Sequence, residues 1–480
     1  MPHSNSTSGS GRVVWVLVFG GIVTTLMSTL VIPLLGELPT ILGTSVANSS
    51  WVVTVTLLSG AVATPVTGRL GDMYGARRIL LLCTIPLIVG SVLCALSSSL
   101  VPMLVGRALQ GAGFGMVPVG ISALRTLVPP EKLGSSIAVM SASLGIGGTL
   151  GLPLAAVVAQ TTSWRFLFWG VATLSVVTAV LIAWVVPSTP AYGAGKRFDA
   201  VGALGVALGL VCLLLVVSKG AEWGWASPTT LALLAGAVVV LLIWGLWELR
   251  IDAPLIDLRV SMGKRVLVTN SVTILIGFSA YFQSLLVPQL RQLPESTGYG
   301  LGQSMIVMGL WCAPSGLAMM AAAPLSARLT ATRGPRATLL TGCLFMATGF
   351  ASSVFLMGST WGLMFVSCSV AAGLGLAYGA IPTVILSSVP PSEGASANSV
   401  NTLLRSVGSS VSAAVSGMVL GWMTIEFAGS VIPSRTGFVT GLMIGCVTAL
   451  VAGAIAMVLR VPKPGTARAH EAHVPEQATG

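Results

Sequence analysis

Long apolar stretches recur along the chain and are separated by short polar segments. Each stretch runs for roughly 18 to 30 residues, and none shows the strict alternation of a half-buried strand. A helix needs about 20 mostly apolar residues to cross the hydrocarbon core of a bilayer, so the pattern predicts fourteen membrane-spanning helices. These lie near residues 13–42, 50–67, 79–97, 101–124, 135–158, 164–186, 200–218, 228–247, 266–290, 301–324, 337–357, 360–386, 397–422 and 437–459.

Composition excludes a soluble globular protein. Hydrophobic residues make up 54% of the chain and charged residues only 8%, with a mean hydropathy of +0.93. A transmembrane β-barrel would instead show alternating segments of about ten residues. We therefore expect an all-α integral membrane protein.

Basic residues gather on one side of the predicted spans. With the amino terminus in the cytoplasm, most of the 24 lysines and arginines fall in cytoplasmic segments. They are Arg12, Arg69, Arg77, Arg78, Arg125, Lys132, Lys196, Arg197, Arg250, Arg259, Lys264, Arg265, Arg328, Arg333, Arg336, Arg460, Lys463 and Arg468, whereas Arg165, Lys219, Arg291 and Arg435 fall outside. An even number of spans puts both termini in the cytoplasm. The net charge of +11 then indicates contact with anionic lipid and not with nucleic acid.

Cysteines and histidines indicate no metal site. The seven cysteines lie inside predicted spans at unrelated spacings, without a Cys-x-x-Cys pair, and are interpreted as packing residues. His470 and His473 lie in a polar tail, 461–480, that we expect to be disordered. Residues 1–12 are polar and carry no signal-peptide pattern.

Two weak internal repeats relate the halves of the chain. Displacing the sequence by 259 residues aligns GRLGDMYGARRILL at 68–81 with ARLTATRGPRATLL at 327–340. Displacing it by 261 residues aligns VPPEKLGSS at 128–136 with VPPSEGASA at 389–397. The agreement predicts two parallel six-helix halves with two extra helices between them, an architecture used for alternating access.

The motifs carry a family resemblance. GRLGDMYGARRIL at 68–80 resembles the signature of the major facilitator superfamily between spans 2 and 3, and RALQGAG at 107–113 resembles its span 4 pattern. The span number and the segments 198–225 and 247–260 are similar to the fourteen-span drug:proton antiporter branch. The resemblance implies a proton-driven exporter of amphipathic small molecules in a bacterial cell membrane. We expect a monomer that is not an enzyme, with the proton as coupling ion and no cofactor. The expected parts are a tail at 1–12, a first half at 13–186, a central loop and two helices at 187–265, a second half at 266–460 and a tail at 461–480.

The charged motif is expected to form a conformational latch on the cytoplasmic face. Its members are Gly68, Arg69, Asp72, Gly75, Arg77 and Arg78. Glycines permit a sharp turn, and Asp72 can accept bonds from free N–H groups at a nearby helix start or pair with an arginine. In the family, the matching carboxylate holds the two halves together in the outward-facing state. The alternative is that the arginines are only positive-inside anchors.

Arg107 is expected inside a span, where an arginine costs about 2.5–3.5 kcal/mol on insertion scales unless it faces a partner or a watery cavity. Together with Gln110, one turn later, it is expected to line the central cavity. The alternative is a structural arginine bound to backbone carbonyls. Arg405 also lies inside a predicted span, with a looser fit to any motif.

Span 5 carries a degenerate form of the exporters' Gly-x-x-x-Gly-Pro-x-x-Gly-Gly signature. The stretch GGTLGLPLAA at 147–156 keeps Gly147 and Gly151, while Pro153 comes one position late. Small residues four apart allow tight helix contact, so ordinary packing explains the segment as well as an export-specific hinge does.

The proton carrier is expected at Glu37. Antiporters of this branch commonly carry an aspartate in span 1, where this chain has Leu30. Glu37 follows seven residues later on nearly the same helical face, and could load and release a proton there. The alternative is a solvated residue at the mouth of the cavity.

Substrate residues are harder to predict. Phe114, Tyr281, Phe282, Gln283 and Trp311 could offer stacking surface and polar groups, although a packing or lipid-facing role is favoured for each. The absence of a Gly-x-x-x-x-Gly-Lys-Ser/Thr loop excludes an ATP-driven pump of the P-loop type. The remaining alternatives are a proton-coupled uptake symporter and a non-transporting membrane receptor on the same scaffold.

Overall fold

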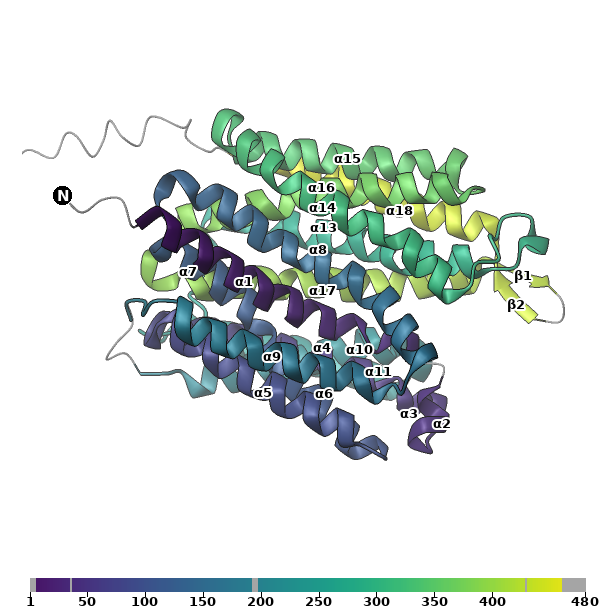
Figure 1. Ribbon diagram of the computed structural model, residues 1–480, viewed down its shortest axis with the longest axis horizontal. Helices are drawn as coiled ribbons and strands as arrows, with labels where there is room; N and C mark the ends of the chain where they lie inside the picture. Colours follow the sequence, from purple (N-terminus) through teal and green to yellow (C-terminus); the bar gives the residue numbers. More distant parts are fainter. Residues whose placement is uncertain (1–5, 35–36, 192–196, 428–429, 460–480) are drawn as a thin grey trace, which may run out of the picture.

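The computed structural model describes residues 6–34, 37–191, 197–427 and 430–459. Over these residues it contains fourteen helices long and apolar enough to cross a membrane, which confirms the predicted number (Figure 1). They are α1 (Ser6–Thr29), α4 (Trp51–Tyr74), α5 (Ala76–Leu96), α6 to α7 (Leu100–Ala112, the 3-10 turn η2 at Gly113–Gly115, and Met116–Leu127), α8 (Pro130–Thr161), α9 (Arg165–Val185), α10 (Ala200–Trp223), α11 (Pro228–Glu248), α13 (Lys264–Gln292), α14 (Met305–Arg333), α15 (Pro335–Leu356), α16 (Thr360–Ser388), α17 (Gly394–Trp422) and α18 (Arg435–Ala456).

Short elements join the long helices. They are η1 (Ile32–Leu34), α2 (Leu38–Leu42), α3 (Val46–Ser49), α12 (Leu258–Ser261), η3 (Glu295–Thr297), η4 (Pro391–Glu393), β1 (Thr424–Phe427) and β2 (Ser430–Pro433). The two strands pair as an antiparallel hairpin. Figure 1 places this hairpin, with α2 and α3, at the end of the bundle opposite the start of α1. We call the end that holds the hairpin the hairpin end, and we call the opposite end, at the start of α1, the basic end.

The first predicted span is wrong at its carboxyl end. The apolar run continues to residue 42, but α1 ends at Thr29 and the chain then forms η1 and α2. Pro33 lacks the N–H that a continuing helix needs, so the helix stops before it.

Lys219 and Arg291, expected in outer loops, instead lie buried near the ends of α10 and α13. Lys196, Arg460 and the tail with Lys463, Arg468, His470 and His473 lie outside the described residues.

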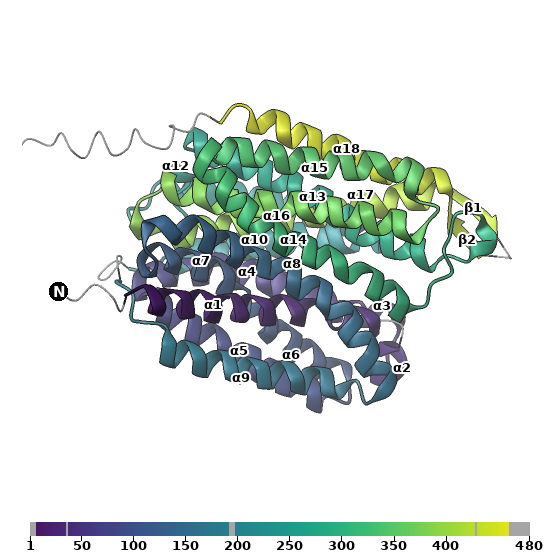
Figure 2. The same ribbon diagram turned by 45° about the horizontal axis from the view of Figure 1, so that its top comes forward.

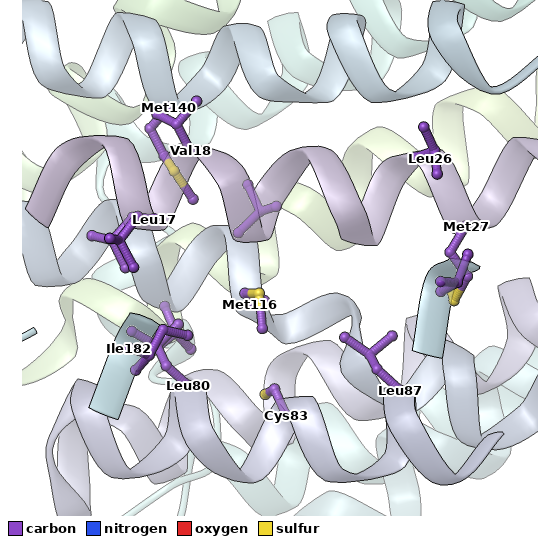
Figure 3. Packing of buried hydrophobic residues seen from close by; sticks show 14 of the residues in the cluster. Leu17, Val18, Leu26, Met27, Leu80, Cys83, Leu87, Met116, Met140 and Ile182 are labelled. Carbon is purple, nitrogen blue, oxygen red and sulfur yellow. The ribbon is translucent and has the colours of Figure 1, made fainter. Parts of the chain in front are cut away.

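Each half has its own hydrophobic core. The core of the first half joins α1, α5, α7, α8 and α9, where Leu17, Leu80 and Met116 are almost fully buried (Figure 3). The core of the second half includes Phe282, Phe350 and Phe438 from α13, α15 and α18. The two halves lie side by side with their helices along one common direction (Figure 2).

The extra helices attach at the junction of the halves. A smaller apolar cluster contains Leu210 of α10, Leu58 of α4 and Leu403 of α17. Lys219 of α10 donates a hydrogen bond to Ser50 Oγ, just before α4, at 2.5 Å. Helix α11 lies outside α10, and only 11% of its most apolar 18-residue stretch is buried within the protein. Such a helix offers most of its surface to lipid.

Candidate functional site

A cavity of about 640 Å³ lies between the two halves. Its walls come from α1 and α8 of the first half and from α13, α14, α16 and α17 of the second half. It runs from Arg405 in the middle of α17 to Gln292 and Met305, where α13 ends and α14 begins at the hairpin end. Ligand sites of transporters lie at such an interface between repeats.

The cavity wall is mostly apolar, with neutral polar groups distributed over it. The neutral polar residues are Thr25, Thr29, Thr149, Tyr281, Gln283, Ser284, Gln289, Gln292, Ser315, Ser367, Tyr378 and Ser409. Of the residues expected to meet substrate, Tyr281 and Gln283 line it. Phe114 packs on Gly60 within the first half, Phe282 is fully buried, and the Trp311 ring stacks edge-on against Trp361, which is 68% exposed. These three are not among the described residues that line the cavity.

Asp72 closes the basic end by bridging the halves. Its Oδ1 accepts a hydrogen bond from the backbone N–H of Ala395 at 3.0 Å, and its Oδ2 accepts one from Ser396 at 2.8 Å. Both N–H groups belong to the first turn of α17, where no intrahelical acceptor exists. The carboxylate also faces the positive end of the helix dipole. Asp72 therefore caps the start of a helix, which is one of the two roles that the sequence allows it.

A close approach of α4 to α17 supports this bridge. A Cβ atom added at Gly68 would lie 2.8 Å from the carbonyl oxygen of Ala395 and would also clash with the Ser399 side chain. Asp72 lies one turn after Gly68 on the same face of α4. We call Asp72 and the two N–H groups that it binds the latch. Arg125 adds a second contact between the halves, since its Nη1 donates to the carbonyl oxygen of Val389 at 3.2 Å.

The two arginines at the end of the motif, Arg77 and Arg78, lie on α5. Helix α4 continues through the motif to Tyr74, so only Gly75, with a φ of 89°, separates it from α5. Arg77 donates to the carbonyl of Ala183 in the first half and to the hydroxyl of Ser188 in the central loop, and Arg78 is exposed. Arg69 is buried on α4. The sharp turn is therefore confined to Gly75, and Gly68 and Asp72 contact α17 across the halves.

The position equivalent to Asp72 in the second half holds an alanine. The displacement of 259 residues that relates the two copies of the motif places Ala331 opposite Asp72. Both copies keep a glycine with positive φ between their helices, Gly75 and Gly334. The turn is thus repeated, but the carboxylate that would cap the start of α8 is not.

Arg107 lies inside the first half and does not line the cavity. Its Nε donates to the carbonyl of Val52 at 3.1 Å, and its Nη1 donates to Met27 at 3.3 Å and to Gln110 Oε1 at 2.7 Å. Gln110 in turn donates to Ser91 Oγ at 2.8 Å. Arg107 and Gln110 are 1% and 0% exposed. The expectation that they line the cavity is wrong, because backbone carbonyls satisfy the guanidinium and no water is required.

Comparison with known proteins gives the family. The family model described as Major Facilitator Superfamily matches residues 17–413, most of the chain. The chain belongs to the Major Facilitator Superfamily. The predicted fold class, two six-helix halves with two central helices, is confirmed.

Relatives within the superfamily include multidrug exporters. An uncharacterized MFS-type transporter of Mycobacterium tuberculosis is 32% identical over 64% of this chain, and the match spans only 44% of that relative's length. The colistin resistance protein EmrB of Acinetobacter baumannii is 26% identical over 88% of this chain and 82% of its own length. The multidrug export protein EmrB of Haemophilus influenzae is 31% identical over 53% of this chain and 51% of its own length.

Solved structures share the superfamily fold. The human organic anion transporter MFSD10 superposes with a TM-score of 0.63 at 18% identity, covering 92% of this chain and 99% of its own. The proton:xylose symporter XylE superposes with a TM-score of 0.61 at 14% identity, covering 93% and 95%.

Glu37 lies outside the cavity of this superfamily member. It is exposed, and it immediately precedes α2, whose Leu38 and Leu42 anchor that helix in the core of the first half. It is not among the described residues that line the cavity. Its position matches the alternative of a solvated residue.

The span 5 glycines pack α8 between two helices. Gly147 and Gly151 face α1, where added Cβ atoms would meet the hydroxyls of Thr25 and Thr29. Pro153 faces α14, because a Cβ on Gly309 would lie 3.2 Å from Pro153 Cα. The neighbouring Gly148 lines the cavity instead. The motif therefore supplies close packing on two faces of α8.

We expect Gly147→Ala to destabilise the protein by about 1–3 kcal/mol, as overpacking does. The new Cβ would lie 2.6 Å from the carbonyl oxygen of Ile22, a backbone atom that cannot rotate away. Gly148→Ala is the matched control, since no heavy atom lies within 4 Å of its added Cβ. Thermal unfolding in detergent measures both, and equal midpoints for Gly147→Ala and wild type would contradict the packing assignment.

Proposed function

We propose that the protein is a secondary active transporter that exports amphipathic small molecules from the bacterial cytoplasm in exchange for protons. The observation that carries the proposal is the cavity between the halves, together with the latch that joins those halves at the other end. A cavity between halves that are joined at the basic end fits one state of an alternating-access cycle. By the positive-inside rule the basic end, with both termini, faces the cytoplasm.

The two halves would then move as bodies around the cavity. Opening the basic end requires α4 to separate from α17, which breaks both hydrogen bonds of Asp72. Their separate hydrophobic cores allow each half to keep its packing during this motion. Helix α10 lies beside α4 and α17, and α11 packs on α10, so both would follow the motion in the membrane. We propose that the protein acts as a monomer.

Export is favoured by the relatives. Two of them are described as a colistin resistance protein and a multidrug export protein, and their matches include much of this chain. The mostly apolar cavity with scattered hydroxyl and amide groups suits amphipathic molecules of varied shape.

A drug-susceptibility panel in a pump-deficient bacterial host tests direction, energy source and substrate class together. We expect expression of the protein to raise resistance to several amphipathic compounds and to lower their accumulation in cells. An uncoupler should restore accumulation. Increased uptake would instead support a symporter, and no change for any compound would support a receptor.

We expect Glu37→Gln to export at the wild-type rate across the pH range. The side chain is exposed beside α2, and no cavity-lining residue that the structure describes is an aspartate or glutamate. A proton and a substrate therefore have no shared carboxylate to compete for in the described cavity wall. Efflux rates of Glu37→Gln and wild type at several external pH values check this. If the variant loses a pH-dependent step that wild type shows, Glu37 is the residue that carries the proton.

A further inference from the structure

We propose that Arg405 binds an anionic group of the transported molecule, so that the exported compounds are amphipathic anions such as aromatic carboxylates. This inference rests on the proposed export function and names its substrate class. It is carried by the position of one cation in a cavity whose described walls hold no negative side chain.

Arg405 lies at the deep end of the cavity. Its guanidinium carbon is 4.9 Å from the centre of the Tyr378 ring, which also lines the cavity. A guanidinium over an aromatic face keeps its charge, because the attraction comes from the ring quadrupole. The side chain is only partly buried, in contrast to Arg107 and Arg291, which are fully enclosed.

Charge around Arg405 is uncompensated in the described structure. The ion pair found among the described residues joins Lys219 to Glu222, on α10. The other described residues that line the cavity are apolar, hydroxyl, amide or sulfur groups. A cation placed within a membrane-spanning helix is tolerated when a partner or a watery cavity receives it. A carboxylate or sulfonate on the substrate would supply that partner through paired, charge-assisted hydrogen bonds.

The backbone around Arg405 is held firmly against α13. A Cβ on Gly277 would lie 2.6 Å from the carbonyl oxygen of Arg405, so the two helices are in close contact. One turn earlier, Asn401 Nδ2 donates to Asn270 Oδ1 at 2.9 Å and to Thr273 Oγ1 at 2.8 Å. A cation on a fixed backbone loses less entropy on binding an anion, which favours a selective site.

The rest of the cavity suits the apolar part of such a molecule. Leu144, Met319 and Leu374 line it from α8, α14 and α16. An aromatic ring can fill this space while its acidic group reaches Arg405. A cationic amphipath of the same shape would meet the positive charge without any described carboxylate to offset it, so the site discriminates by charge.

Binding of three ligands with one ring system tests the inference. The probes are radiolabelled 1-naphthylacetate, its neutral methyl ester and the cationic 1-naphthylethylammonium, measured by equilibrium dialysis on the full-length protein in lipid nanodiscs. We expect wild type to bind the anion at least about tenfold more tightly than either of the others. Arg405→Gln should remove this preference and leave ester binding unchanged, and Arg405→Lys should keep part of it.

Arg12→Gln is the matched control. Arg12 is exposed at the start of α1 and is not among the described residues that line the cavity, so its loss should leave the charge preference unchanged. Equal or tighter binding of the cation by wild type, an unchanged preference in Arg405→Gln, or no measurable binding of the anion would overturn the inference. Because the assay needs no transport, a failed charge preference with efflux intact rejects the substrate class alone. A clear preference without efflux in the susceptibility panel rejects the exporter and keeps the site.

Discussion

Asp72→Asn is expected to lower drug efflux by at least about tenfold while the protein still inserts and accumulates normally in the membrane. The carboxylate binds two N–H groups at the start of α17, one with each oxygen. An asparagine keeps one acceptor oxygen and turns an NH₂ group toward the second N–H. The variant also loses the negative charge that faces the helix start.

The expected size follows from those two bonds. Hydrogen bonds to a charged group contribute about 1.5–3 kcal/mol each, and 1.4 kcal/mol changes an equilibrium about tenfold. Weakening the latch therefore shifts the protein away from the state that is closed at the basic end. Efflux rate per membrane-inserted molecule is the measurement. Arg78→Gln is the control, since Arg78 is exposed in the same motif. Normal efflux by normally inserted Asp72→Asn would reject the latch.

Arg107→Ala is expected to lower the free energy of unfolding by about 3 kcal/mol or more and to abolish efflux as a consequence. The guanidinium joins the carbonyls of Met27 and Val52 to Gln110, and so ties α1 to α4 and α6. Its removal leaves a void in the core of the first half and takes the Arg107 donor from Gln110 Oε1 and from the Met27 carbonyl, whereas the Val52 carbonyl keeps the hydroxyl of Thr56. Unpaired buried acceptors are costly where no water can replace the donor.

Thermal unfolding in detergent and the amount of protein in the membrane both report this loss. The stability of Arg107→Lys should fall between those of wild type and Arg107→Ala, because one ammonium cannot reach all three acceptors in the guanidinium geometry. Arg12→Ala is the control for loss of an exposed arginine from α1. If Arg107→Ala unfolds at the same temperature as wild type but shows no efflux, Arg107 has the direct role in transport that its motif implies.

Much of the fold could be predicted from the sequence because a bilayer imposes a minimum length on each apolar run. The predicted spans 200–218 and 360–386 end within a few residues of α10 and α16. The first span failed for a local reason. Residues 30–42 remain apolar, and hydrophobicity alone cannot separate a spanning helix from η1 and α2, which are buried in the core of the first half by Leu34, Leu38 and Leu42.

The site was less predictable, because its contacts involve backbone groups and distant helices. The pattern allowed Asp72 to cap a helix start or to pair with an arginine, and it did not identify α17, more than 300 residues away, as that helix. The partners of Arg107 are largely carbonyls, which leave no mark in a sequence. Arg405 lacked a clear motif, and its exposure to the cavity comes from the packing of α17 against α13.

The central claim, export driven by protons, is tested most directly in proteoliposomes that contain only the purified protein. A compound identified by the susceptibility panel is loaded at equal concentration on both sides, and a pH gradient is then imposed. The account predicts that the compound moves against the direction of proton flow and therefore accumulates on the acidic side. An uncoupler or Asp72→Asn should prevent this accumulation. Accumulation in the direction of proton flow, or equal distribution with and without the gradient, would contradict it.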